Sequence, residues 1–189
     1  MFIRQKLFSR NKKGQLTTEG LPQGWNIIYA QSVVKYLNCL EPLFDKARKK
    51  SEFQFILTLL RFRGIQSSDD DPYQNSVETI DTLMSLEKKI KGRARLNVFL
   101  WVYGHIVESS EPYEIMANLL NICLGQGYRL FNFPYRKIGY GFRSQYPFEK
   151  INYLENLAQK AKIPSILEPI KEILDRDLRN AIFHSDYSV

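Results

Sequence analysis

Residues that build disulfide frameworks and metal centres are scarce in this 189-residue chain, which has two cysteines and two histidines. Cys39 and Cys123 lie in apolar stretches, outside any CxxC pair and away from both histidines. A Cys/His zinc site is therefore excluded, and a buried free thiol is expected at each position. The lack of a disulfide framework is typical of a reducing compartment, so we expect a cytoplasmic protein.

Long apolar runs are also missing. No uninterrupted apolar run reaches the roughly 18 residues of a membrane-spanning helix, and the charged first residues do not resemble a secretory signal. The sequence contains no Gly-rich phosphate loop, no Ser-His-Asp order, no HExxH motif and no EF-hand pattern. These absences argue against a membrane protein, a nucleotide hydrolase, a serine hydrolase and a metalloprotease. We expect neither a metal nor another cofactor.

The charge balance is basic, with 27 Lys and Arg against 20 Asp and Glu and a net charge of +7. A hydrophobic content of 44% is ordinary for a globular protein, and the length suits one medium domain with a sizeable core. A net positive charge attracts polyanions, so nucleic acid is a reasonable partner. A basic protein without such a partner remains an equal alternative at this point.

Helical periodicity dominates the sequence from Trp25 onward. We predict an all-α fold for residues 25–189, a single domain built as a bundle of about five to seven helices with one long aromatic and basic loop. Residues 1–24 carry five cations without an apolar period, which predicts a basic arm or a short hairpin.

Three of the helices carry specific expectations. Pro42 is predicted to kink or break the first helix, because proline removes a backbone hydrogen bond. Residues 93–111 are apolar almost all round, which predicts the central helix of the bundle, with His105 as a hydrogen-bonded core histidine rather than a second catalytic one. The last helix is predicted to run from Ser165 to His184, with a capping box at its start.

Residues 125–147 are predicted to form the long loop, because glycine and proline recur throughout them. Cations alternate there with aromatic residues, which is an arrangement that can neutralise phosphates and stack on bases. The alternative is that the rings pack onto the bundle, and the two interpretations can both hold. The residues predicted to bind nucleic acid are Arg129, Arg136, Lys137, Arg143, Tyr135 and Tyr140.

The end of the chain is the one place where an Arg, an Asn and a His lie close together on a well-marked helix. At about 100° per residue, Asp177, Asn180 and His184 form a polar stripe, whereas Arg179 lies about 140° from His184. Either the helix unwinds near its end or a second copy supplies a matching set, which favours a homodimer through the last helix. The alternative is that His184 ends the helix as a cation and Arg179 is solvated surface.

The order Arg179-Asn180-Ala181-Ile182-Phe183-His184 resembles the Arg-x4-6-His motif of the HEPN superfamily, a group of helical proteins that includes many metal-independent endoribonucleases. The resemblance implies that His184 acts as general base or acid, that Arg179 stabilises the charge of the transition state, and that Asn180 orients His184 or the phosphate. Asp177 is the supporting residue of the polar stripe. Attack by the RNA 2′-hydroxyl would leave a 2′,3′-cyclic phosphate and a 5′-hydroxyl.

Three functions follow as hypotheses. The first is a HEPN-type endoribonuclease, of the kind found in toxin–antitoxin or antiviral defence systems, with RNA as substrate and an antitoxin as a further partner. The second is a non-catalytic HEPN-like module that binds RNA or a protein partner. The third is a helical interaction protein in which the motif has no role.

Overall fold

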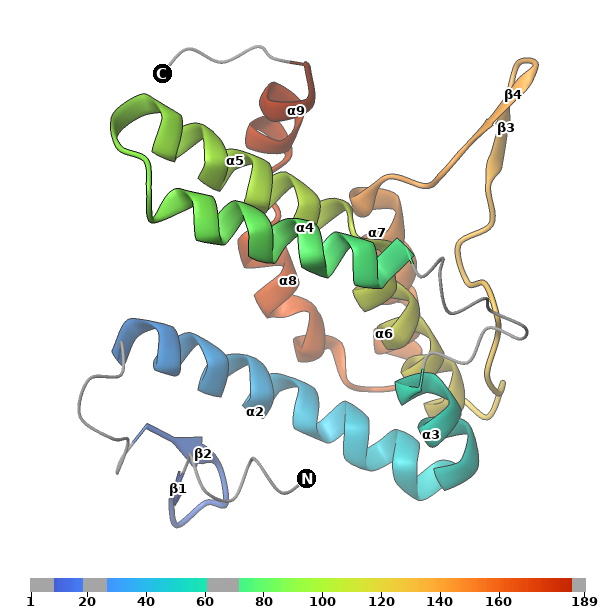
Figure 1. The fold of residues 1–189 in the computed structure, drawn as a ribbon. Coiled ribbons are helices and arrows are strands. Elements are labelled where there is room, and N and C mark those ends of the chain that lie inside the picture. The colour runs from blue at the N-terminus through green and yellow to red at the C-terminus, as the bar shows by residue number, and fades with distance from the viewer. Residues whose placement is uncertain (1–8, 19–26, 61–71, 185–189) are drawn as a thin grey trace.

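The computed structural model describes residues 9–18, 27–60 and 72–184 of the chain, and these are mostly helical (Figure 1). The predicted all-α class is confirmed. The first part of the chain contains β1 (Ser9–Arg10), β2 (Leu16–Thr17), α2 (Ile27–Lys50), α3 (Glu52–Leu59), α4 (Pro72–Glu87), α5 (Gly92–Glu108) and α6 (Ser110–Cys123). The second part contains β3 (Arg136–Ile138), β4 (Gly141–Arg143), α7 (Pro147–Lys160), the short 3-10 helix η1 (Pro164–Leu167), α8 (Glu168–Ile173) and α9 (Arg176–His184).

The centre of the bundle is α6, which is buried along most of its length and packs against α2, α3 and α7. Its side chains Leu119, Leu120 and Ile122 are almost completely buried in the main core. Burial of these apolar side chains removes them from water and stabilises the helix in the bundle.

The prediction that residues 93–111 form the central helix is wrong. The α5 helix packs against α4 along one side and against α9 near its end, and several of its large apolar side chains stay exposed (Figure 1). His105 is half-buried, and its ring makes no hydrogen bond within the described residues. The apolar character of α5 therefore reflects two packing neighbours and an uncovered side, not a position at the centre.

Pro42 does not break the first helix, since α2 continues through it to Lys50. A proline within a helix costs about 3 kcal/mol. Pro42 itself is exposed, while the next residues on the inner side, Leu43 and Ala47, are fully buried in the core. Packing on both sides of the proline thus outweighs its local cost.

Of the two structures predicted for the N-terminal segment, a basic arm or a short hairpin, its described part forms the hairpin. The β1 and β2 strands pair antiparallel and lie on α2. The Asn38 side chain accepts a hydrogen bond from Leu16 N at 2.9 Å and donates one to Leu16 O at 3.0 Å, and Arg10 pairs with Glu41 at 2.6 Å. At least one cation of the predicted arm, Arg10, is therefore already paired with a carboxylate of the protein itself. Residues 1–8 and 19–24 of the predicted arm lie outside the described residues.

The prediction of a single helix from Ser165 to His184 is also wrong, because the chain forms η1, α8 and α9 in succession. The break falls at Leu174, which has an extended ψ of 97° and a buried side chain. The Tyr103 hydroxyl accepts a hydrogen bond from Asp175 N at 2.9 Å, and the Asp175 carboxylate accepts one from Leu178 N at 2.9 Å. Burial of Leu174 and these two hydrogen bonds end one helix and start the next.

Candidate functional site

The α9 helix is held against α5 at a glycine. A Cβ atom added to Gly104 would lie 3.2 Å from Cζ of Phe183, closer than ordinary contact, so a residue without a side chain lets the two helices approach. Ile182 is buried at this contact, and the Phe183 ring meets Trp101 edge-on at 6.4 Å between centroids. This packing fixes how α9 is rotated, and so fixes where its polar residues point.

Arg179 points back toward the end of α5 and is nearly enclosed, with 14% of its side chain exposed. Its Nε and one terminal nitrogen each lie 2.5 Å from Oε1 of Glu108, and its other terminal nitrogen donates to Oδ1 of Asn180 at 3.1 Å. The guanidinium carbon lies 5.2 Å from the ring centroid of Tyr146 and 5.0 Å from that of Phe183. Arg179 is thus a fixed group between two rings and not solvated surface.

His184 lies at the exposed end of the same helix, and within the described residues its side chain has no hydrogen-bond or ion-pair partner. The α9 helix is continuous from Arg176 to His184, so it does not unwind between Arg179 and His184. Five residues of α-helix separate the two side chains by about 140°. One copy of the chain therefore brings Arg179 and Asn180 together but does not bring His184 to them. Asp177 is exposed in the first turn.

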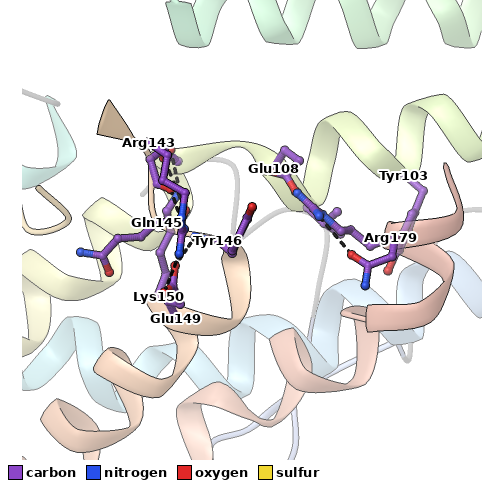
Figure 2. Close-up of polar contacts among 12 residues, drawn as sticks. Tyr103, Glu108, Arg143, Gln145, Tyr146, Glu149, Lys150 and Arg179 are labelled. Atoms are coloured by element: carbon purple, nitrogen blue, oxygen red, sulfur yellow. Dashed lines mark hydrogen bonds and ion pairs between the residues drawn. The ribbon is translucent and has the colours of Figure 1, made fainter. Parts of the chain in front are cut away.

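A second cluster lies at the start of α7, where one carboxylate binds two guanidinium groups (Figure 2). Glu149 accepts from Arg143 at 2.8 and 3.1 Å, from Arg136 at 2.8 Å and from Tyr146 N at 2.8 Å. The hydrogen bonds from Arg143 and from this backbone N–H lower the pKa of Glu149 to about 2. Two of the cations predicted to bind nucleic acid are therefore already paired with a carboxylate.

Tyr146 connects the two clusters. Its ring centroid lies 4.0 Å from the guanidinium carbon of Arg143 as well as 5.2 Å from that of Arg179. Figure 2 shows Tyr146 between the Arg143–Glu149 pair and the Arg179–Glu108 pair. The candidate site is therefore one continuous surface that runs from the β3–β4 hairpin to α9.

The remaining residues predicted to bind nucleic acid lie on or near the β3–β4 hairpin, which extends away from the helices (Figure 1). Tyr135, Lys137 and Tyr140 are exposed on it. The backbone of Arg129 is fixed by Asn118, which accepts from Arg129 N at 2.8 Å and donates to Arg129 O at 3.0 Å, while the Arg129 residue as a whole stays exposed. These four residues do not share the enclosed site of Arg179.

The structure also contains a buried lysine that was not predicted from the sequence. Lys150 is 2% exposed, donates to Oγ of Ser110 at 2.8 Å and lies 5.2 Å from the ring centroid of Tyr113. Burial lowers the pKa of Lys150, and the charges of Glu108 and Glu114 oppose that change. The sequence pattern does indicate this burial, because position 150 falls on the apolar side of α7, in helical register with the buried residues of that helix.

The described residues contain no group of three or more His, Cys, Asp and Glu side chains that could hold a metal ion. Cys39 and Cys123 are free and half-buried, and burial raises the pKa of both thiols. In the parts of the chain that the structure covers, no helix is long and apolar enough to cross a membrane. No family model, curated protein or solved structure matches the chain.

Proposed function

We propose that this chain is a metal-independent endoribonuclease of the HEPN type. The observation that carries the proposal is the fixed Arg179 guanidinium, bonded to Asn180 and followed on the same helix by the exposed His184. A pre-oriented guanidinium stabilises the negative charge that develops on the phosphoryl oxygens without reorganising during the reaction. A histidine transfers protons efficiently near neutral pH, because its ordinary pKa lies there.

In this proposal the active unit is a homodimer in which α9 of one copy faces α9 of the other. The angle of about 140° between Arg179 and His184 on a continuous helix means that one copy cannot direct both at the same phosphate. A two-fold axis beside α9 would bring His184 of each copy toward Arg179 of the other. The large apolar side chains exposed on α5 and α9 are Leu96, Phe99, Trp101, Ile106, Leu178 and Phe183, and such an interface would cover those on the side that faces the two-fold axis.

The local charge favours an anionic ligand, although Arg179 is paired with Glu108. Glu108 also faces the buried Lys150, and Glu149 is shared by two arginines. Across the two clusters the three arginines Arg136, Arg143 and Arg179 thus outnumber the two carboxylates that pair with them, Glu108 and Glu149. A phosphate can therefore approach a surface that is positive overall.

A second candidate is a non-catalytic module that binds RNA or a protein partner such as an antitoxin. The observation that favours it is the same Arg179–Glu108 contact, because a guanidinium held by a carboxylate has to exchange that partner before it can act on a phosphate. Within the first candidate, the biological setting that we propose is a cytoplasmic toxin or defence component.

The deciding experiment is cleavage of an end-labelled RNA of mixed sequence in EDTA by the wild type, Arg179→Ala and His184→Ala. Arg176→Ala is the matched control, since it removes an exposed arginine from the same helix. We expect the wild type and the control to leave 2′,3′-cyclic phosphate ends, and the other two variants and an all-DNA strand to give no product. Binding without cleavage by the wild type would support the non-catalytic RNA-binding module. Neither binding nor cleavage would refute the nuclease and the RNA-binding module, and would leave only the binding of a protein partner.

A further inference from the structure

An open groove of about 580 Å³ lies between α7 and the segment that leads into the β3–β4 hairpin. This volume is within the range of roughly 300–1,000 Å³ typical of small-ligand sites. We infer that the groove binds an unstacked base of single-stranded RNA, on the same strand as the nucleotide held at Arg179. The inference deepens the proposed function and rests on it for the identity of the ligand.

The floor of the groove is one polar side of α7. Glu149, Asn152, Tyr153 and Asn156 all line it, and their spacing of three and four residues places them on the same helix face. The Asn152 side chain has no hydrogen-bond partner within the described residues, and Asn156 donates only to the backbone oxygen of Asn152. A side-chain amide offers both donors and an acceptor, which is what pairing with the edge of a base requires.

The wall of the groove provides an aromatic surface on a fixed backbone. Phe131 lines the groove and is 68% exposed, although a phenylalanine ring normally gains free energy by burial. The backbone beside it is anchored, because Asn132 N and its side-chain amide both donate to Glu114 at 2.9 Å, and Asn121 donates to Asn132 at 2.7 Å. Phe131 is thus an exposed ring next to an anchored stretch of backbone, which suits stacking on a base.

The charge around the groove selects a polyanion. Residues 128–153 contain five Lys and Arg and a single carboxylate, Glu149. Arg136 and Arg143 pair with that carboxylate, whereas Arg129 and Lys137 have no carboxylate partner within the described residues. Unpaired cations beside an amide-lined and aromatic groove favour a nucleic acid over a neutral or basic peptide.

The groove is joined to Arg179 by direct contacts. Glu149 lines the groove and binds Arg143, the Arg143 guanidinium lies on the Tyr146 ring, and that ring faces Arg179. A strand whose phosphate lies at Arg179 would therefore pass the Tyr146 ring and Arg143 before it reaches the groove. Only a single strand can do this, since a base in a duplex is stacked and paired.

The test is binding of a fluorescein-labelled single-stranded RNA by fluorescence anisotropy in EDTA. The variants are Phe131→Ala and Asn152→Leu, and Asn75→Leu, an exposed asparagine on α4, is the matched control. Loss of one base-stacking contact raises Kd by roughly 5- to 150-fold, so we expect a rise of that size for Phe131→Ala, a smaller rise for Asn152→Leu and none for the control. Both groove residues are exposed, so circular dichroism should show unchanged folding.

An abasic strand of the same length separates base recognition from phosphate binding. We expect the wild type to bind it more weakly than RNA with bases, and the two groove variants to bind it as the wild type does. Equal binding of both strands by the wild type, or variants with unchanged affinity for RNA, would overturn the inference. Cleavage of the same RNA is measured in a separate assay. Base-dependent binding without cleavage would refute the proposed nuclease but not the base-binding groove. Cleavage at the same rate by the wild type and both groove variants would refute the groove but not the nuclease.

Discussion

Replacing Glu149 with glutamine should remove a measurable part of the stability, because this carboxylate holds two arginines at the start of α7. A carboxyl group whose pKa falls from 4.5 to about 2 on folding contributes at most about 3 kcal/mol at neutral pH. The Glu149 side chain is 24% exposed and its partners face solvent, so screening reduces this to about 1–2 kcal/mol. We expect Glu149→Gln to lower the free energy of unfolding by that amount at pH 7.

The stability that Glu149 contributes should decrease as the pH is lowered. Because the pKa of Glu149 is lower in the folded state, its contribution is complete above pH 4.5 and is lost as the pH falls toward 2. The difference between wild type and Glu149→Gln should therefore fall below half of its neutral value by about pH 3. Glutamine can still accept the hydrogen bond from Tyr146 N, so the helix start should remain formed.

Urea unfolding followed by circular dichroism between pH 7 and pH 3 measures this difference. Glu155→Gln on the same helix is the matched control, since Glu155 pairs with the single cation Lys171. That variant should change the stability by less than about 1 kcal/mol. An equal stability of wild type and Glu149→Gln at pH 7, or a difference that stays constant down to pH 3, would refute the role given to this carboxylate.

Two further predictions concern α9. Glu108→Gln removes the negative charge beside Arg179, so the variant should bind RNA more tightly and with a steeper salt dependence than the wild type. Fluorescence anisotropy across a salt series measures both, and an unchanged affinity would contradict the prediction. In Gly104→Leu the new Cβ atom would lie 3.2 Å from Cζ of Phe183, which is closer than ordinary contact. We therefore expect α9 to shift away from α5 and the free energy of unfolding to fall by about 1–3 kcal/mol. Tryptophan fluorescence in a Trp25→Phe background, in which Trp101 is the remaining tryptophan, reports that shift. Ala94→Leu on the exposed start of α5 is the control, and spectra of Gly104→Leu identical to those of the parent would contradict the prediction.

The sequence predicted the fold class because helical periodicity is a local signal. It did not predict where the helices break or which one is central, since those features depend on distant partners. The break before α9 depends on Tyr103, which is 72 residues from Asp175. The continuity of α2 through Pro42 depends on burial of Leu43 and Ala47 against other helices. The apolar character of α5 could not show that part of its surface would remain uncovered.

Like the fold, the candidate site could be predicted from the sequence only in part. Arg179, Asn180 and His184 were named from six consecutive residues, and the structure brings the first two into contact. The groups that hold Arg179 could not be named from local pattern, because Glu108 is 71 residues away and Tyr146 belongs to another helix start. The separation of Arg179 and His184, in contrast, follows from helix geometry alone and needed only the finding that α9 is continuous.

The Tyr146 ring lies against two guanidinium groups, which would repel each other if both were unpaired. Each is paired with a carboxylate, Arg179 with Glu108 and Arg143 with Glu149, which Arg136 also binds, and these pairs reduce the repulsion between the two guanidinium groups at one ring. A phosphate that replaces Glu108 as the partner of Arg179 would keep that balance, whereas simple loss of Glu108 would not. In the proposed function, Arg179 would therefore exchange the Glu108 carboxylate for a phosphate while its contact with the Tyr146 ring is kept.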